Sequence, residues 1–182
     1  MSTDRASALR FLIYVALYVV AAEFAVVFVV LPTDVTLIWP SAGIAYAVLV
    51  YHGRRWWPVI PIGILLTHLL VTPAPWIFIP FSAASNTIAT LVAVTLAERI
   101  GGRELVTLRV GSGFVLLVGG AVSASISALI GVSGMLLAAM VPPHDAIYAI
   151  GKWFAGDVFG IIVVTPFTLM VLRSIDRGSL VD

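Results

Sequence analysis

The chain has 182 residues, of which 61% are hydrophobic and only 10% carry a charge. A mean hydropathy of +1.12 excludes a soluble globular domain, and the lack of cysteine excludes disulfides, thiolate catalysis and cysteine-ligated metals. The net charge of +1 comes with scattered arginines, so no basic patch for nucleic acid is expected. The composition therefore predicts an all-α membrane protein with room for one integral-membrane domain.

Apolar stretches separated by turn residues predict a compact bundle of about six transmembrane helices, since a bilayer crossing takes about 20 such residues. In chain order, the expected spans cover residues 9–31, 38–51, 56–71, 76–97, 111–130 and 146–172. The second span is short and would cover about 21 Å of a roughly 30 Å hydrocarbon core. An apolar extension from Gly131 to Val141 predicts a kink or a half-helix. Pro166 predicts a kink near the inner end of the last span.

The positions of the basic residues predict the orientation of the bundle. Nine of the ten Lys and Arg residues lie before the first span, after the last span or in alternate loops, at Arg5, Arg10, Arg54, Arg55, Arg99, Arg103, Arg109, Arg173 and Arg177. The remaining loops hold no basic residue. Because cytoplasmic loops carry an excess of Lys and Arg, both termini are expected in the cytoplasm.

Three charged residues fall inside the expected spans, namely Glu23, Lys152 and Asp157. A charge at mid-membrane costs roughly 2.5–3.5 kcal/mol on insertion scales, so such residues normally face a bundle interior or a water-filled cavity. We expect Lys152 to form an intramembrane ion pair with either Glu23 or Asp157. The pair either locks the bundle or contacts a ligand and transmits a signal, and these two roles are compatible.

The last span has two different faces when its residues are placed about 100° apart. One arc of about 140° carries the polar and small residues, namely Lys152, Trp153, Gly156, Asp157 and Gly160. The opposite side is expected to face lipid and carries Phe154, Val158, Ile161 and Ile162. Gly156 and Gly160 form a pair of small residues that permits a close helix approach.

A polar pocket is expected in the outer half of the bundle, where polar residues of several spans reach comparable depths. Trp39 and Pro40 open the short second span, and free N–H groups near Ser41 would face the cavity. The predicted ligand-binding residues are Trp39, Ser41, Asn86, Lys152, Trp153 and Asp157. Lys152 favours an anionic or carbonyl-bearing small molecule as the ligand.

Several of these residues have a plainer interpretation. Trp39 is equally well explained as a residue of the interfacial aromatic belt, and Asn86 as a partner in an interhelical hydrogen bond. Trp56 and Trp57 fit an aromatic belt at the inner interface. His68 lacks metal-ligand spacing to the other two histidines, so no metal site is expected.

The fifth span carries a packing face, because small residues recur every fourth position at Gly120, Ala124 and Ala128. The sequence contains no hydrolytic triad, phosphate-binding loop, zinc-protease motif or dinucleotide fingerprint. We therefore expect neither enzymatic activity nor a cofactor.

Three motifs, taken in order, resemble a known family. They are Trp39–Pro40–Ser41–Ala42–Gly43–Ile44–Ala45, Gly53–Arg54–Arg55–Trp56–Trp57–Pro58 and Trp153–Phe154–Ala155–Gly156–Asp157–Val158–Phe159–Gly160, followed by Pro166. They are similar to the patterns of the membrane-associated sensor family of the first type (MASE). The resemblance extends from about Leu9 to Leu172.

The resemblance implies an integral-membrane input domain of bacterial signalling proteins, located as a multi-pass protein in the inner (plasma) membrane. Family members place this domain before diguanylate cyclase, phosphodiesterase or histidine kinase modules, so a cytoplasmic output domain is an implied partner. The family domain usually continues for further helices. Residues 1–182 are therefore expected to form a single sensor-type domain, either truncated or a short relative.

The leading hypothesis is a sensor whose periplasm-facing pocket biases a cytoplasmic output when a ligand binds. The alternative is a small-molecule binding or transport subunit that resembles the six-helix substrate-binding components of energy-coupling-factor transporters. A membrane scaffold, in which the charges only lock the fold, is a third alternative. The expected partners are a small-molecule ligand and the lipid bilayer, nucleic acid is not expected, and a homodimer is left open.

Overall fold

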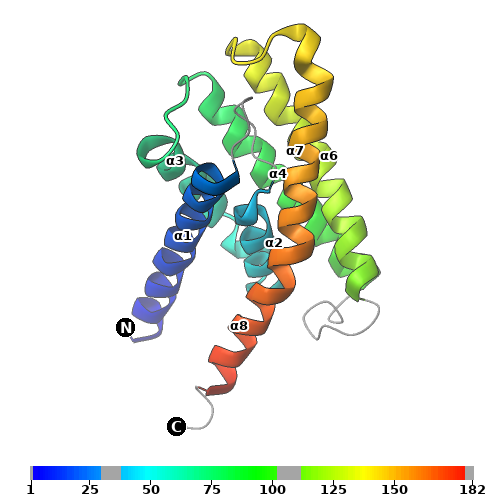
Figure 1. Cartoon of the computed structure of the whole chain (residues 1–182). Helices are drawn as coiled ribbons and strands as arrows, with labels where there is room; N and C mark the ends of the chain where they lie inside the picture. The colour runs from blue at the N-terminus through cyan, green and yellow to red at the C-terminus, as the bar shows by residue number, and fades with distance from the viewer. Residues whose placement is uncertain (1, 30–37, 102–111, 179–182) are drawn as a thin grey trace.

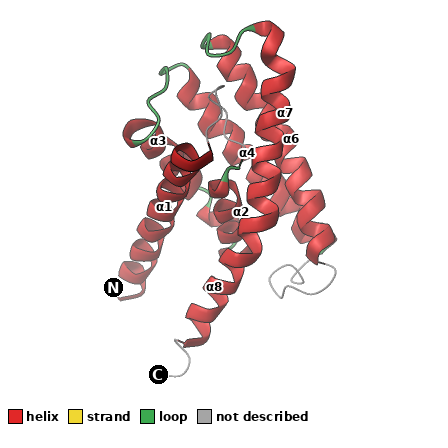
Figure 2. Ribbon diagram, viewed as in Figure 1, coloured by secondary structure: helices red, strands yellow, loops and turns green. Residues whose placement is uncertain are grey.

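The computed structural model describes residues 2–29, 38–101 and 112–178, and their side chains within 5–26, 38–101 and 112–176. All regular structure in these ranges is helical, which confirms the predicted all-α class (Figure 2). The helices are α1 (Ser2–Val29), α2 (Pro40–His52), α3 (Val59–Leu70), α4 (Phe78–Ile100), α6 (Ser112–Leu137), α7 (Ala146–Phe159) and α8 (Thr165–Gly178). Short 3₁₀ turns at Arg54–Trp56 and Pro143–Asp145 and a π-helical segment at Gly160–Val164 connect them.

The apolar stretches differ in length, and this difference divides the bundle into two kinds of helix. Within the described ranges, four helical stretches are long and apolar enough to cross a membrane, namely Arg5–Val26, Phe78–Ile100, Ser112–Leu137 and Pro143–Asp176. In contrast, α2 has 13 residues and α3 has 12, so each is only about 18–20 Å long. The sequence predicted the short α2 but not the short α3, which begins late because the chain first forms the Arg54–Trp56 turn.

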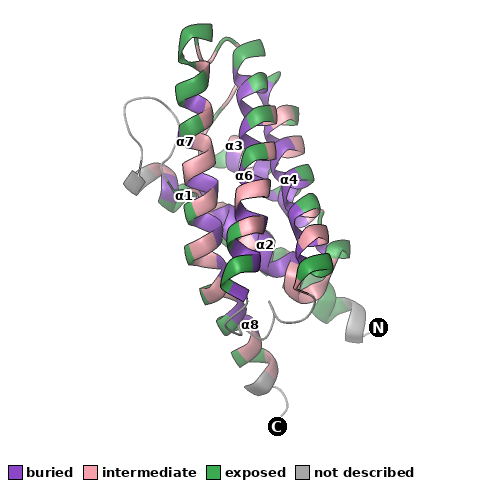
Figure 3. Ribbon diagram, turned by 90° about the vertical axis from the view of Figure 1, so that its right-hand side faces the viewer, coloured by how far each residue is buried: buried purple, intermediate pink, exposed green. Residues whose placement is uncertain are grey.

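Helix α2 lies among the longer helices and forms much of the buried core (Figures 1 and 3). It packs against α1, α4, α8 and the π-helical segment. Eight of its 13 residues are buried. A helix that is apolar on all sides is typical of a protein core or a membrane span, and α2 takes the first of these positions. The small residues at its start, Ser41 to Gly43, let neighbouring backbones come close.

A tight joint holds the start of α2 against the π-helical segment between α7 and α8. A side chain on Gly160 would clash with the carbonyl of Trp39, and one on Gly43 would clash with the carbonyl of Gly160. The Trp39 N–H donates to the Gly156 carbonyl at 3.0 Å, and the Thr165 hydroxyl donates to the Gly43 carbonyl at 3.1 Å. The structure thus confirms the close approach predicted at Gly160 and identifies the start of α2 as its partner.

The π-helical segment between α7 and α8 has a local cause. Pro166 has no N–H to offer, and its ring would clash with the carbonyl four residues earlier. The chain widens into the π-helical segment just before this proline. The predicted kink therefore takes the form of a π-helical segment. Because that segment departs from the 100° spacing, the lipid-facing position predicted for Ile161 is wrong: the side chain is 1% exposed and packs in the core.

Helix α6 corrects a second expectation. A kink or a half-helix was expected in the apolar extension from Gly131 to Val141. The first part of this extension is not a separate half-helix, because it continues α6, which ends at Leu137. The predicted packing face is confirmed, since Gly120, Ala124 and Ala128 are all buried. Glycine is needed at Gly131, where a Cβ would lie 2.5 Å from the Trp153 ring. The absence of a side chain at Gly131 thus lets the Trp153 ring pack directly against α6.

The two ends of the bundle carry different residues. The arginine end holds Arg10, which lies 3.9 Å from Asp176, and Arg54, which lies 3.3 Å from Glu98. The start of α1 and the end of α8 lie toward this end (Figure 1). The opposite end, the loop end, holds the connections 71–77 and 138–145. The predicted cytoplasmic location of the arginine end stays a prediction.

Trp56 corrects the expected inner aromatic belt. Its side chain is buried, and its ring lies against Phe11, Tyr14 and His52. Trp57 is 45% exposed, as a belt residue would be. The difference arises because the Arg54–Trp56 turn folds the first of the two tryptophans back between α1 and α2.

Candidate functional site

A cavity of about 400 Å³ lies at the loop end and is called here the loop-end cavity. Its walls come from α1, the residue before α2, α3, α4, α6, α7 and the two loops of that end. The lining residues are Val26, Trp39, Ile64, Thr67, His68, Thr72, Pro73, Ala74, Phe78, Ser82, Asn86, Met135, Met140, Trp153, Gly156 and Asp157. The volume lies in the range of small-molecule sites, which are mostly apolar with a few polar groups.

His68 and Ser82 form a hydrogen-bonded pair on one wall of the cavity. The ring Nδ1 lies 3.0 Å from the Thr72 carbonyl, and Nε2 lies 3.1 Å from the Ser82 hydroxyl. A carbonyl can only accept, so Nδ1 carries the proton. In the neutral ring Nε2 then accepts from the serine hydroxyl. Both ring nitrogens are therefore engaged with the protein.

Asn86 lies one helical turn after Ser82 on α4. Its amide nitrogen donates to the Ser82 carbonyl at 3.0 Å and contacts the Ser85 hydroxyl at 3.3 Å. Both contacts lie within α4, so the interhelical hydrogen bond considered for this residue is not the bond that its amide nitrogen makes. The side-chain carbonyl oxygen is the group through which Asn86 can accept a hydrogen bond from a ligand.

Asp157 is the carboxylate of the cavity wall and is only 2% exposed. The side chains of Ser127 and Trp153 are placed to donate hydrogen bonds to it. The Trp153 indole N–H also lies 2.9 Å from the Ser127 hydroxyl, which ties the two donors together. The indole ring fits against α6 because Gly131 has no side chain. The carboxyl of Asp157 is thus held in a fixed position at the wall.

The structure brings four of the six predicted ligand-binding residues to this cavity, namely Trp39, Asn86, Trp153 and Asp157. Ser41 is not among the lining residues, because its hydroxyl donates to the Tyr18 carbonyl at 2.8 Å. Lys152 is buried but also lies outside the lining, with its ammonium 4.7 Å from the centre of the Tyr148 ring. Whether these residues bind a ligand stays a prediction.

The predicted ion pair also remains untested. Glu23 lies on an exposed face of α1, and the side chains placed to bond the Asp157 carboxyl are Ser127 and Trp153. The reason for this arrangement is the register of α7, where Lys152 and Asp157 lie five residues apart and diverge by about 140°. The pairing of Lys152 with an acid is therefore kept as a prediction.

Three lining residues were not among the predicted site residues, namely His68, Phe78 and Ser82. One signal could have found two of them, because Phe78, Ser82 and Asn86 recur every four residues and so share one face of α4. His68 carries no such signal. Its place depends on how α3 packs against α4. Among the described residues, no group of three His, Asp or Glu side chains could hold a metal ion.

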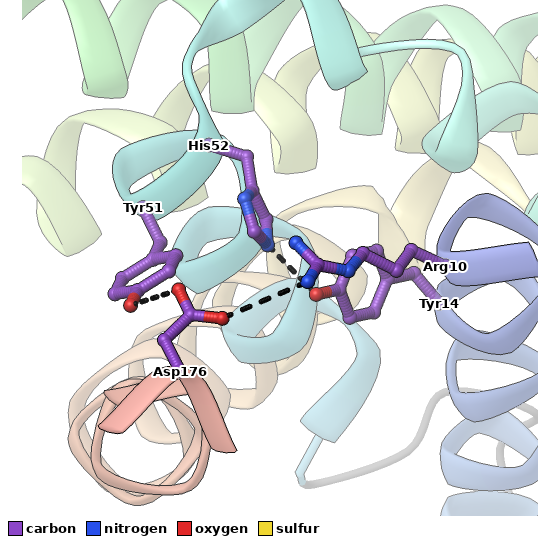
Figure 4. Close-up of polar contacts among 5 residues, drawn as sticks. All are labelled: Arg10, Tyr14, Tyr51, His52 and Asp176. Carbon is purple, nitrogen blue, oxygen red and sulfur yellow. Dashed lines mark hydrogen bonds and ion pairs between the residues drawn. The ribbon is translucent and has the colours of Figure 1, made fainter. Parts of the chain in front are cut away.

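A second polar cluster lies at the arginine end and is called here the arginine-end cluster. It joins three helices through Arg10 and Tyr14 of α1, Tyr51 and His52 of α2 and Asp176 of α8 (Figure 4). The Tyr51 hydroxyl donates to the Asp176 carboxylate at 2.6 Å, and Arg10 approaches the same carboxylate at 3.9 Å. Tyr14 and His52 share a hydrogen bond of 2.7 Å. The cluster thus connects α8 to both α1 and α2.

His52 is the titratable ring of this cluster and follows the last residue of the expected second span. Burial lowers its pKa from the ordinary value of 6.5, because the charged ring loses water. The Asp176 carboxylate opposes this effect, and the nearby Arg10 and Arg55 add to it. The ring is therefore held in its neutral form over a wider pH range than a free histidine.

Comparison with known proteins identifies a family for this chain. A protein-family model described as MASE1 matches residues 9–179, which is nearly the whole chain. No curated protein and no solved structure matches the chain.

Proposed function

The chain belongs to the MASE1 family of membrane sensory input domains, and we propose that its loop-end cavity is the ligand site of such a sensor. The resemblance found in the three sequence motifs is confirmed by this match. The chain is a multi-pass membrane domain with helices long and apolar enough to span a bilayer. The family is a sensory one rather than a catalytic one. The remaining question is where this domain receives its signal.

The observation that carries the proposal is that one helical rod connects the cavity to the arginine end. Asp157 lines the cavity near the end of α7, and Asp176 lies in the arginine-end cluster on α8. Between them lies the π-helical segment Gly160–Val164. Such segments occur often at functional sites and at points where a helix changes direction. A ligand that shifts Asp157 would therefore be expected to shift α8 through this continuous helix.

A second connection runs through the start of α2. Trp39 lines the cavity, and its backbone N–H holds the Gly156 carbonyl at 3.0 Å. The other end of α2 carries Tyr51 and His52 of the arginine-end cluster. A ligand that displaces Trp39 would thus act on α2 and on α7 together. A coupling free energy on the order of 1–3 kcal/mol is typical of such linkage.

In the proposed setting, the loop end and its cavity face the periplasm of a bacterium and the arginine end faces the cytoplasm. The positive-inside distribution of the arginines supports this orientation. The output would be a cytoplasmic diguanylate cyclase, phosphodiesterase or histidine kinase module joined beyond α8. Ligand binding would change the packing of α8 and so the activity of that module.

The test is a fusion of this chain, through α8, to a diguanylate cyclase module, with cyclic di-GMP measured in cells. Ser82→Phe fills the cavity from α4, because Ser82 is buried and lines it. We expect the output to change at least about threefold, which corresponds to less than 1 kcal/mol of bias. The matched control is Ile88→Phe, on the same helix at a side chain that is 47% exposed. Equal outputs of the two variants, at equal protein levels, would overturn the proposal.

A further inference from the structure

We propose that the loop-end cavity takes a small organic cation, an amine or ammonium group on an apolar body, with Asp157 as its counter-ion. This inference rests on the proposed function, because it names the ligand class of the same site. It replaces the anionic ligand that Lys152 had suggested. The geometry of the described lining residues supplies three separate arguments for it.

The first argument is the charge of the wall. The described lining contains one carboxylate, Asp157, and no Lys or Arg side chain. His68 uses Nδ1 and Nε2 in hydrogen bonds to the protein, so neither ring nitrogen is left open for a ligand. Lys152 lies beside Tyr148 rather than at the wall. An anionic ligand would therefore be repelled by Asp157, and none of the described lining residues is a Lys or Arg that could pair with it.

The second argument is the balance of donors and acceptors. The Asp157 carboxylate and the Asn86 carbonyl oxygen both accept hydrogen bonds, and the wall presents both of these side chains. The nearest side-chain donors are engaged, since the Trp153 N–H bonds Ser127 and the Asn86 amide bonds Ser82. An ammonium group has only donors to offer. The N–H donors of an ammonium group thus match the open acceptors of the wall, which are the Asp157 carboxylate and the Asn86 carbonyl oxygen.

The third argument is the aromatic lining. Trp39, Phe78 and Trp153 all contribute to the wall, and the rings of Phe78 and Trp153 meet edge to face at 6.3 Å between centroids. Aromatic faces attract cations, most strongly where water is excluded. Met135 and Met140 add flexible apolar surface that suits the body of the ligand. Together these residues form a wall that favours a cation with an apolar body.

The burial of Asp157 decides how strongly charge is recognised. Its side chain is 2% exposed, and electrostatic attraction grows as the surroundings exclude water. Ser127 and Trp153 hold the carboxyl in place, so a cation gains the contact without first having to order it. Neutral and anionic analogues of the same shape lack this gain. We expect discrimination by charge of at least about tenfold, the ratio that 1.4 kcal/mol provides.

The experiment compares three probes of one shape on the purified chain in lipid nanodiscs. They are 2-phenylethylamine, 2-phenylethanol and 3-phenylpropionate, which carry a cationic, a neutral and an anionic group. Binding is followed by tryptophan fluorescence, because Trp39 and Trp153 line the cavity. The variants are Asp157→Asn, which removes the charge and keeps the shape, and Asp145→Asn. The latter is the matched control, an exposed acid at the same end of the molecule.

The expected result is that the amine binds at least about tenfold more tightly than the other two probes. Asp157→Asn should abolish this preference, and Asp145→Asn should retain it. Three results would each overturn the cation proposal. The amine and the alcohol could bind equally, the carboxylate could bind most tightly, or no probe could bind at about 5 mM. A preference that survives Asp157→Asn would overturn the role of that residue. The proposed sensor function is tested separately by the Ser82→Phe fusion, which needs no ligand.

Discussion

The two ends of the bundle use polar residues in opposite ways. At the loop end, polar groups are buried and surround a cavity of about 400 Å³, and Asp157 is only 2% exposed. At the arginine end, Asp176 keeps 41% of its side chain exposed and is satisfied by Tyr51 and Arg10 from two other helices. The loop end thus leaves hydrogen-bond acceptors open around the loop-end cavity. The other end uses its polar groups to tie helices together.

Under the proposed function, the loop end would receive the ligand and the arginine end would pass the change to the output module. A ligand that donates hydrogen bonds to the open acceptors of the loop-end cavity would be stabilised there, because a buried acceptor without a hydrogen bond is unfavourable. The arginine-end cluster gains nothing from a ligand, but its bonds depend on how α1, α2 and α8 are placed. The joint at Gly160 lies between these two regions. Breaking each part separately should therefore give separable effects.

The largest effect is expected at the joint. Gly160→Val would push a side chain into the Trp39 carbonyl, and overpacking of this kind costs about 3 kcal/mol. The measurement is thermal unfolding in detergent. The control is Gly151→Val on the exposed side of α7, where a Cβ would meet nothing within 4 Å. A Gly160 variant as stable as its control would show that the joint is not tight.

The next effect is expected at the cavity. Trp153→Phe removes the indole N–H that bonds Ser127 at 2.9 Å and helps to hold Asp157. We expect a loss of about 1–2 kcal/mol of stability, from the lost hydrogen bond and the smaller ring. Trp76→Phe, at a side chain that is 79% exposed, should change stability by less than about 0.5 kcal/mol. Equal losses would mean that the indole N–H has no structural role.

A smaller effect is expected from Tyr51→Phe at the arginine end. It removes a hydroxyl that donates to Asp176 at 2.6 Å, and partial exposure reduces the loss to about 1 kcal/mol. A double-mutant cycle with Asp176→Asn should show that the two losses are not additive. Probe binding at the loop end should be unaffected, which would separate the two regions. Strict additivity would contradict the hydrogen bond.

The pH dependence of stability should report the same cluster. Because the folded-state pKa of His52 lies below 6.5, the unfolded chain binds more protons as the pH falls below that value. Stability is therefore fully present above pH 6.5 and declines as the pH falls through the folded-state pKa. The effect should be smaller than that of Tyr51→Phe. The readout is the midpoint of unfolding against pH, and His52→Gln should flatten the curve. An unchanged slope in that variant would assign the dependence to other groups.

The smallest effect is expected from Arg10→Gln. Arg10 and Asp176 are 3.9 Å apart with half and 41% of their side chains exposed. Such pairs contribute roughly 0–1 kcal/mol, so a stability change below about 0.5 kcal/mol is expected. Urea unfolding in detergent micelles gives the difference. A loss as large as that of Tyr51→Phe would show that the carboxylate depends on Arg10 instead.

Much of the bundle could be predicted from particular residues. The short apolar run at residues 38–51 marked α2 as short, and the repeat Gly120, Ala124 and Ala128 marked the packed face of α6. Trp39, Asn86, Trp153 and Asp157 were placed together because helical rise fixes depth once the spans are ordered. These inferences needed only local geometry. They hold because each follows from spacing within one element.

Other features could not be predicted from spacing. Ile161 was expected to face lipid, but the π-helical segment turns it into the core. Lys152 shares an arc of α7 with Trp153, and yet it lies beside Tyr148 and outside the cavity lining. His68 reaches the cavity only through the packing of α3 on α4. In each case the outcome depends on a neighbouring helix.

The sequence by itself determined the class of this protein, its expected orientation and the depth of its polar residues, because hydropathy, loop charge and helical rise are properties of one chain segment at a time. Only the tertiary structure decided which polar groups surround the cavity and which tie the arginine end together. That choice follows from the rotation of each helix about its axis. The rotation is set by close contacts such as Gly160 on Trp39 and Gly131 on Trp153, which join residues far apart in the sequence.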